Sequence, residues 1–444
     1  MTAREETEAR LDRIGRRDGA LKAFITVDAP GARAAADAAD AAAADGRWLG
    51  LLHGMGVAVK DNIDAAGLRA TAGSLFFKDH VPNADAPVVE RLRRAGAVIL
   101  GKTNLHEFAY GVRTVSSVGG QTANPWNPER IPGGSSGGSG AAIAAGLCAG
   151  ALGSDTGGSV RLPASFNGIS GLRPSVGRID DAGCVPVSAQ HDTIGPMARS
   201  VADVARIFAA LAGPDPDDPA WRGRAPLENF LPGLQDGIAG LRVGVPTHHY
   251  FEGAEADIAD AAMAAARALE RLGARLIDVR LPGAEEAPGR AFVMIACDAA
   301  HFHRERLAQG RAMWDGQTYD RMIAGSAVPG VEYAASVAAK RTWKRTLAAL
   351  FREIDVLLAP TSPARVPPIA DSRNLLEATR AATQNTYPGS FGELPGLSIP
   401  CGFGRDGMPV GLQLEAQWGG EATLWRTGMA YQAATDWHRA EPPG

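Results

Sequence analysis

The sequence predicts an α/β fold built around one large sheet, and three observations support this prediction. Short apolar runs typical of strands alternate with longer segments in which apolar residues recur at helical spacing. The chain has 444 residues, 45% hydrophobic and 21% charged, which is enough apolar material for a layered core. Its sequence contains no internal repeat. We therefore expect a single domain over residues 1–444.

The N-terminal part is predicted to be helical, and alternating strands and helices follow. Residues 4–46 have helical spacing and end in an Ala/Asp-rich stretch, which we interpret as a solvated helical face. A strand is expected within 54–63 (GMGVAVKDNI), a helix over 86–96 and a second strand over 97–104. The apolar segment AAIAAGLCAGALG at 141–153, between two Gly/Ser-rich loops, predicts a buried helix.

The C-terminal part continues the same alternation after an irregular stretch. Residues 213–240 are rich in Pro, Asp and Gly and predict a long surface excursion. The strands expected after it are 241–245, 274–281, 355–360, 396–400 and 409–416, and the helices are 256–272 and 334–353.

Charge and cysteine content exclude several classes of protein. The net charge is -4, from 45 basic and 49 acidic residues, so nothing favours nucleic acid or an anionic membrane as a partner. Neither a membrane-spanning run nor the apolar centre of a secretory signal is found, which predicts a cytoplasmic protein. Metal-ligand spacing is absent too, so we expect no metal, no organic cofactor and reduced thiols at Cys148, Cys184, Cys297 and Cys401.

Two matches to short motifs fail on their context. Residues 96–103 fit the phosphate-binding pattern G-x-x-x-x-G-K-T, but the intervening Ala-Val-Ile-Leu belongs in a strand and not in a phosphate-binding loop. Residues 133–137 fit the G-x-S-x-G nucleophile elbow, which requires a hydrophobic strand directly before it. The preceding NPWNPERIP contains three prolines and no strand. We therefore expect neither nucleotide binding nor a Ser-His-Asp hydrolase.

The chemistry is expected in two segments rich in glycine and serine, IPGGSSGGSG and GSDTGGSVRLPAS. Glycine at this density suits close approach of the backbone to a ligand. The alternative is a pair of flexible linkers, but the apolar segment between them predicts loops that are held firmly. Ser159 follows two glycines, where consecutive N–H groups could converge on an oxyanion. These loops contain no histidine, so Lys60, which ends the apolar run Val-Ala-Val, is the candidate base.

These segments resemble a known family. VAVKDNI, IPGGSSGGSG and GSDTGGSVRLPASFNGISGLRPS, followed by CVPVSAQHDTIGPMARS, are similar to the amidase signature. The intervals between Lys60, Ser135 and Ser159 agree with the Ser-Ser-Lys arrangement of that family. The resemblance is dense over about 50–205 and weaker towards the C-terminus. It implies one large mixed, mostly parallel twisted sheet covered by helices on both faces, with residues 206–444 completing the sheet and the substrate pocket.

The resemblance also implies a role for each matched residue. Ser159 would be the nucleophile that forms an acyl-enzyme, and Ser135, after a cis peptide bond, would relay the proton to neutral Lys60. The oxyanion hole would consist of the N–H groups of Thr156, Gly157, Gly158 and Ser159. The residues expected to support these loops by hydrogen bonds are Ser136, Asp155, Arg161 and Asp192.

The substrate is predicted from the side chains expected around the pocket, which are mostly apolar. They are Phe108, Tyr110, Trp314, Tyr319, Met322, Tyr387 and Phe391. We therefore expect a serine amidohydrolase that cleaves the C–N bonds of small, rather hydrophobic amides, and also aryl esters and carbamates, as a urethanase does. We expect it to act as a monomer or homodimer whose partners are small molecules only.

The alternative hypothesis is the glutaminase subunit of a tRNA-dependent amidotransferase. In that subunit, the resemblance implies, an acidic residue holds the amino group of glutamine. Thr383 stands at the corresponding position in this sequence, with no carboxylate between Glu377 and Glu393. Ser390 replaces an asparagine nearby, and Arg321 corresponds to the arginine that would bind the glutamine carboxylate. Without a partner for its ammonium group, a free amino acid is expected to bind poorly. A non-catalytic binding protein is disfavoured because all three catalytic positions are present.

Overall fold

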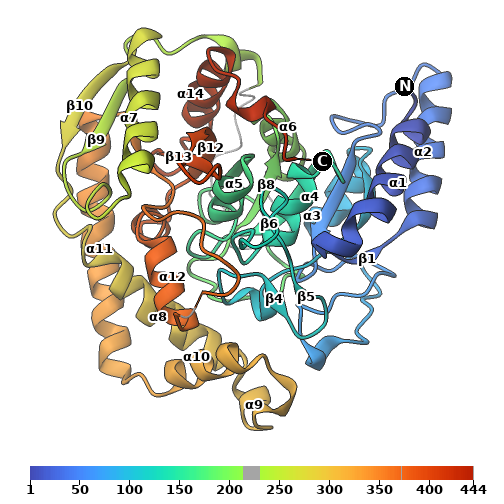
Figure 1. The fold of residues 1–444 in the computed structure, drawn as a ribbon, viewed down its shortest axis with the longest axis horizontal. Coiled ribbons are helices and arrows are strands. Elements are labelled where there is room, and N and C mark those ends of the chain that lie inside the picture. The colour runs from blue at the N-terminus through green and yellow to red at the C-terminus, as the bar shows by residue number, and fades with distance from the viewer. Residues whose placement is uncertain (214–230, 372, 444) are drawn as a thin grey trace.

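A computed structural model describes residues 1–213, 231–371 and 373–443 of the chain (Figure 1). Most of the surface excursion predicted at 213–240 therefore lies outside the described residues. Strands and helices alternate along much of the described chain, as the sequence predicts. No helix in the described part combines the length and the apolar character that crossing a membrane requires.

An eleven-stranded sheet runs through the molecule in the order β1-β3-β2-β6-β8-β7-β12-β13-β11-β9-β10. The β7–β12 pair joins a strand from the first described range to one from the last. Figure 1 shows the N-terminal helices at one end of the molecule and β9 and β10 at the other. The strands are β1 (Phe24–Val27), β2 (Gly56–Lys60), β3 (Val98–Thr103), β6 (Gly150–Ser154), β7 (Ser170–Arg173), β8 (Ile194–Ala198), β9 (Arg242–Pro246), β10 (Arg275–Val279), β11 (Val356–Pro360), β12 (Gly396–Phe403) and β13 (Pro409–Glu415).

The sheet is mixed, as expected, but its strand pairs are not mostly parallel. Parallel pairing is confined to the groups β3-β2-β6 and β11-β9-β10, and the other neighbours are antiparallel. The reason lies in the connections. A short turn joins β12 to β13 and permits only antiparallel pairing, whereas a parallel pair needs a longer crossover.

Helices cover both faces of the sheet, as the family resemblance implies. One face packs against α3, α6, α7 and α14 in a single hydrophobic cluster. The other face carries the N-terminal helices with α4 and α5, and a second cluster around α8 and α11. These helices are α3 (Pro87–Arg94), α4 (Gly137–Ala144), α5 (Arg161–Asn167), α6 (Val201–Leu211), α7 (Ala256–Arg271), α8 (Ala287–Phe302), α11 (Gly330–Glu353) and α14 (Glu421–Ala433).

Two of the predicted helices are interrupted. The helix expected over 4–46 is α1 (Ala3–Leu21) and α2 (Ala29–Ala44) with β1 between them, because Phe-Ile-Thr-Val favours a strand and pairs with β3. The helix expected over 141–153 ends with α4 at Ala144. Gly146 then has a φ of +72°, which suits the residue after a helix, and the rest of that segment leads into β6.

The parallel strands β2 and β6 bring the candidate catalytic segments to one edge of the sheet. Lys60 is the last residue of β2, and Ser154 is the last residue of β6. Because these strands run side by side in the same direction, their carboxyl ends lie together. The two Gly/Ser-rich loops lead into α4 and α5, and the second of them follows β6 directly.

Candidate active site

Lys60 and Ser135 meet in the interior, where both are completely buried. The Nζ of Lys60 donates hydrogen bonds to Ser135 Oγ at 2.6 Å and to Ser154 Oγ at 2.8 Å. The Gly134–Ser135 peptide bond is cis, which confirms the expectation from the family resemblance. Burial lowers the pKa of the Lys60 ammonium to about 7, although buried acidic groups act in the opposite direction. A large share of this side chain is therefore a neutral amine near neutral pH.

Ser154 is a contact of Lys60 that the sequence did not predict. Its Oγ accepts hydrogen bonds from Lys60 and from the Asn62 side chain, at 2.8 and 3.3 Å. Ser136 holds the same residue through its backbone, since its Oγ donates to the Ser154 carbonyl at 3.2 Å. The signal that could have identified Ser154 is its place at the end of the strand next to β2. Ser136 lies where a supporting residue was expected.

Ser159 is the most accessible of the three predicted catalytic residues, because it is only partly buried. Its carbonyl accepts a hydrogen bond from the N–H of Ser136 at 3.2 Å, which ties the two Gly/Ser-rich loops together. The loop with Ser135 is anchored further by the His106 N–H, which donates to the Ser135 carbonyl at 3.0 Å. A substrate would therefore reach Ser159 before the buried Ser135 and Lys60.

The backbone N–H groups before Ser159 differ from the predicted oxyanion hole at one position. Gly158 donates its N–H to Asp155 Oδ1 at 2.7 Å, so this donor is already used and the prediction is corrected there. The cause is backbone direction, since Gly158 has a φ of +136° and its N–H turns towards the carboxylate. Among the described residues, none accepts a hydrogen bond from the N–H of Thr156, Gly157 or Ser159.

Gly157 is held against the short helix α13 (Tyr387–Phe391) of the C-terminal part. Its carbonyl accepts a hydrogen bond from Thr386 Oγ1 at 2.6 Å. A Cβ atom on Gly157 would lie 2.6 Å from the Tyr387 ring, so only glycine fits at this approach. The Thr386 hydroxyl thus fixes the carbonyl side of this peptide, and the Tyr387 ring forms a wall beside the loop.

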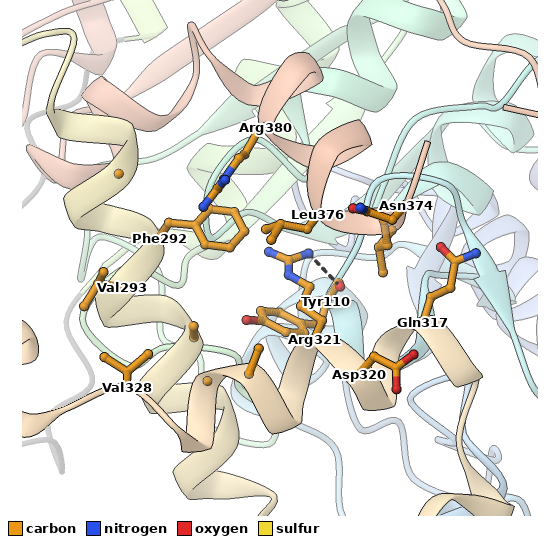
Figure 2. A pocket seen from close by; sticks show the side chains of 15 residues that line it. Tyr110, Phe292, Val293, Gln317, Asp320, Arg321, Val328, Asn374, Leu376 and Arg380 are labelled. Atoms are coloured by element: carbon orange, nitrogen blue, oxygen red, sulfur yellow. Dashed lines mark hydrogen bonds between the residues drawn. The ribbon is translucent and has the colours of Figure 1, made fainter. Parts of the chain in front are cut away.

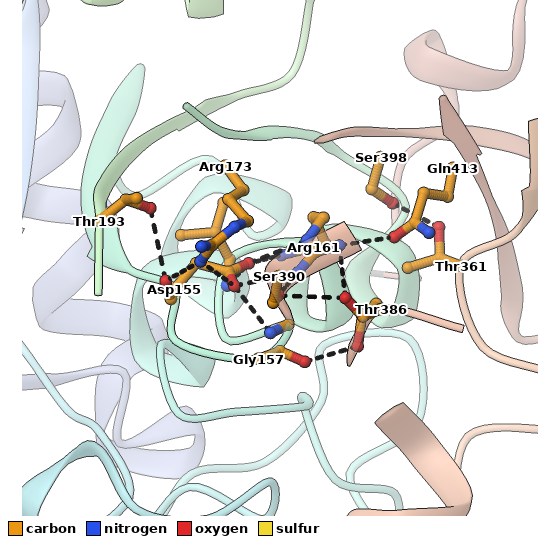
Figure 3. A network of polar contacts seen from close by, with 12 residues as sticks. Asp155, Gly157, Arg161, Arg173, Thr193, Thr361, Thr386, Ser390, Ser398 and Gln413 are labelled. Carbon is orange, nitrogen blue, oxygen red and sulfur yellow. Dashed lines mark hydrogen bonds and ion pairs between the residues drawn. The ribbon is translucent and has the colours of Figure 1, made fainter. Parts of the chain in front are cut away.

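Arg161 and Asp155 form the centre of a buried polar network behind this loop (Figure 3). The Arg161 guanidinium donates to both Asp155 oxygens at 3.1 Å, and also to C-terminal partners. These partners are the Thr386 carbonyl, Ser390 Oγ, Gln413 Oε1 and Glu415 Oε1. Burial acts to raise the pKa of Asp155, but Arg161 and Arg173 together hold it well below its usual range. Arg173 was missed because its sequence position gives no sign of burial.

Asp192 supports the same loop from the other side. Its Oδ1 accepts from Thr156 Oγ1 at 2.5 Å, and its Oδ2 accepts the N–H groups of Val187 and Ser188 at 2.8 and 2.9 Å. Burial raises the pKa of Asp192 to about 6, although these hydrogen bonds lower it. Asp192 and Arg161 therefore both occupy structural positions around the loop.

A cavity of about 460 Å³ opens between α8, α10 (Gly316–Ser326) and α12 (Leu375–Thr383) (Figure 2). Tyr110 and Phe292 supply its apolar wall, and Arg321 and Arg380 project towards it. A second cavity of about 610 Å³ shares Phe292 and Arg380 with the first and reaches Tyr387. The Tyr387 ring, which lines this second cavity, also abuts Gly157 in the loop before Ser159.

The predicted pocket residues fall into two groups. Tyr110 and Tyr387 line the two cavities. The others line neither cavity and pack within or against the cluster around α8. Aromatic side chains contact one another there: the ring centroids of Phe108 and Trp314, for example, are 5.0 Å apart. This second group is Phe108, Trp314, Tyr319, Met322 and Phe391.

Thr383 lines the second cavity from the end of α12, but its hydroxyl is engaged within the helix. Its Oγ1 donates to the Thr379 carbonyl at 2.6 Å. The two carboxylates that flank it in sequence have other partners. Glu377 caps the start of α12, and Glu393 pairs with Lys340 and Lys344.

Comparison with known proteins matches residues 5–425 to the family model described as amidase. This chain belongs to the amidase family. Curated relatives, each named as the A subunit of glutamyl-tRNA(Gln) amidotransferase, are 40% identical in Chloroflexus aurantiacus, over all of this chain and 95% of the relative, and 37% identical in Thermosynechococcus vestitus, over 99% and 96%. A solved structure described as a vestigial protein complex that reveals the evolutionary origins of an s-triazine catabolic enzyme has a TM-score of 0.94 at 37% identity, covering all of this chain and 97% of that one.

The family membership makes this chain an enzyme that acts on amide C–N bonds. The relatives also correct two predictions. Full-length relatives at 37–40% identity are named amidotransferase subunits, which overturns the prediction of a hydrolase for small hydrophobic amides and gives no support to carbamates or aryl esters. They are named as subunits, and the structural neighbour is described as a complex, so the prediction of small-molecule partners alone is wrong. Pocket composition misled the first prediction, because most of the aromatic residues belong to the core.

Proposed function

We propose that this chain is the ammonia-releasing component of an amidotransferase, and that Lys60, Ser135 and Ser159 carry the reaction. The observation behind this proposal is the buried contact of Lys60 Nζ with Ser135 Oγ at 2.6 Å, in a chain whose full-length relatives are named amidotransferase subunits. An amine with a pKa of about 7 is matched to proton transfer at neutral pH.

In the first half of the reaction, Ser159 attacks the carboxamide carbon of the donor. Its proton passes to Ser135 Oγ, and the proton of Ser135 passes to the neutral amine of Lys60. The reverse relay protonates the leaving nitrogen, and ammonia departs from the acyl-enzyme. In the second half, water attacks the ester under the same base, which frees Ser159. Every proton taken from a nucleophile is thus returned to a leaving group.

Negative charge on the carbonyl oxygen is stabilised by the free N–H groups before Ser159. Thr156, Gly157 and Ser159 supply these donors, while Gly158 uses its own N–H for Asp155. Loss of one such donor typically costs about 3–4 kcal/mol of transition-state stabilisation. The Asp155–Arg161 network holds the loop in this geometry before substrate arrives.

The acceptor and the partners are proposed from the relatives. Because these relatives are named as the A subunit of glutamyl-tRNA(Gln) amidotransferase, glutamyl-tRNA is the first acceptor to test. The other subunits of that amidotransferase are the first partners to test. We further propose that residues 1–444 form one domain, since strands from the first and the later described ranges belong to one sheet. A reducing, cytoplasmic setting is supported by four free cysteines.

The experiment is to measure ammonia release from L-glutamine and from glutaramate, the monoamide of glutaric acid. The chain is assayed alone and after co-expression with the remaining amidotransferase subunits of Chloroflexus aurantiacus, with and without glutamyl-tRNA. We expect release in the complex and its loss in Ser159→Ala. Failure of both donors in the assembled, tRNA-supplied complex would contradict the proposal.

A further inference from the structure

We propose that Arg380 determines donor specificity, and that the pocket selects a carboxylate-bearing amide without an ammonium group, that is, a monoamide of a dicarboxylic acid. The inference rests on the proposed function and names the substrate class for the same site. It follows from the two arginines of the cavity, from the lack of a buried carboxylate opposite them among the described residues, and from Tyr387, which lines the second cavity and abuts the loop before Ser159.

Arg321 is a buried cation without a counter-ion. Its side chain is on α10 with 7% exposure, and it forms no ion pair with any described residue. Nη1 donates only to neutral oxygens, the Tyr110 carbonyl at 3.0 Å and Thr379 Oγ1 at 3.3 Å, and Nε has no partner among the described residues. The guanidinium lies 3.8 Å from the Tyr110 ring centroid and 4.7 Å from that of Phe292. A cation buried at this cost is suited to an anionic group that enters the cavity.

Arg380 adds a second positive charge to the same space. It projects from α12 towards Phe292, with its Cζ 5.3 Å from the ring centroid, and it lines both cavities (Figure 2). No described carboxylate forms an ion pair with it. Two guanidiniums that line the cavities therefore lie near the Phe292 ring.

The acidic residues near these arginines are directed elsewhere. Asp320 lines the first cavity but pairs with Arg311 at 2.6 Å. Glu285, in the second cavity, lies 4.0 Å from His248 on the exposed side. Glu252 also lines that cavity, on its exposed side. At Thr383, one helical turn after Arg380, the hydroxyl is bonded within the helix. An ammonium group in this pocket would thus meet two guanidiniums and no buried carboxylate of the described chain.

The position of Tyr387 between Arg321 and the Ser159 loop determines how a donor molecule would lie in the site. Tyr387 lies near enough to Arg321 for the guanidinium charge to act to lower the Tyr387 pKa, although burial raises that pKa to about 12. The Tyr387 ring also abuts Gly157, two residues before Ser159. A donor whose carboxylate binds Arg321 would therefore extend past Tyr387 and place its carboxamide at Ser159. Arg380, beyond Phe292, would favour the carboxylate end and repel an α-ammonium.

The test compares glutaramate, L-glutamine and neutral pentanamide as donors for the complete enzyme complex. We expect glutaramate to have the highest kcat/KM. In Arg380→Gln, the KM for glutaramate should rise about tenfold, as expected for a lost charge-assisted contact, with kcat and the KM for pentanamide unchanged. Arg345→Gln, an exposed arginine on α11 outside both cavities, is the matched control and should leave every constant unchanged.

Two results would overturn the inference: a higher kcat/KM for L-glutamine than for glutaramate in the wild type, or an unchanged KM for glutaramate in Arg380→Gln. If no amide is hydrolysed, the proposed function fails, and calorimetry on the Ser159→Ala protein with glutarate then tests the inference alone. Binding of glutarate that weakens about tenfold in the Ser159→Ala/Arg380→Gln double variant would still support the anion site. Equal binding by the two proteins would refute it.

Discussion

The arginines of the catalytic loops and those of the neighbouring cavity differ in their partners. Arg161 and Arg173 are completely buried and both pair with Asp155, while Arg161 also bonds four C-terminal groups. Arg321 is almost as deeply buried, yet within the described chain it contacts only neutral oxygens and aromatic rings. Arg161 and Arg173 thus hold the loop in its geometry before substrate binds. Arg321 has no counter-ion in the described chain, so an anionic group of the substrate could pair with it.

The largest expected effect tests the catalytic side of this contrast. Ser159→Ala and Lys60→Met should each lower kcat by about 10⁴-fold or more, because the two residues act as one unit with Ser135. The double variant should be scarcely worse than either single variant. Ammonia release measures these rates. Ser398→Ala removes a completely buried serine on β12 that bonds Thr361; this variant should retain activity, and a comparable loss there would remove the distinction.

Stability is the next test, because a paired buried arginine should matter to folding and an unpaired one should not. Arg161→Met leaves Asp155 short of its main partner and should lower the free energy of unfolding by about 3–5 kcal/mol. Arg321→Met removes a desolvated charge that has no counter-ion in the described chain, so its cost should be much smaller. Urea denaturation of both variants provides the comparison, and equal losses would contradict it.

The pH dependence of kcat/KM tests whether Lys60 acts as the base in its neutral form. Since its pKa is lowered to about 7, kcat/KM should rise about tenfold per pH unit below 7 and level off above it. The same shift has a consequence for stability. From pH 7 to 10.5 the unfolded chain keeps a proton that the folded chain has lost, so this residue's contribution to stability increases with pH there. The Lys60→Met variant should lack that increase, and a flat rate profile between about pH 6 and 8 would exclude the base role.

A smaller effect should follow when the charge pattern of the cavity is reversed. Thr383→Asp combined with Arg380→Gln places a carboxylate where an ammonium group could pair and removes the repelling guanidinium. The ratio of kcat/KM for L-glutamine to that for glutaramate should increase about fivefold, as for an ion pair worth about 1 kcal/mol. Arg345→Gln again serves as the control. An unchanged ratio would show that the end of α12 does not contact the donor.

Removal of metal ions is expected to have no effect, because the proposed steps use only side chains and backbone N–H groups. Dialysis against EDTA followed by the ammonia assay measures this. Activity lost to EDTA and restored by a divalent cation would contradict the proposed mechanism.

The proposed catalytic residues could be located from the sequence because they lie in dense, local patterns. Glycine and serine runs mark the loops around Ser135 and Ser159, and the apolar run before Lys60 signals a buried strand end. Ser154 was missed because its contact with Lys60 depends on which strands are neighbours. β1 was missed since four residues between two helices give too short a pattern, and pairing with β3 decides its conformation.

The cavity was less predictable because the chemical type of a side chain does not say which surface it faces. Phe108, Trp314 and Tyr110 all belong to the cluster around α8, but of these three Tyr110 alone also lines the cavity. Arg380 resembles any other exposed arginine of a helix until Phe292 and Arg321 are seen beside it. The oxyanion donors needed backbone directions, which decide that Gly158 serves Asp155.

Arg161 contacts residues far along the chain, and this separation affects when the enzyme becomes active during its synthesis. Arg161 precedes Glu415 by 254 positions, and its contacts with Gln413 and Glu415 need β13, one of the last elements of the chain. A nascent polypeptide on the ribosome therefore carries the nucleophile long before it can brace the loop around it. We expect translation intermediates that end before β13 to be inert, so that amide cleavage begins only after β13 has been synthesised.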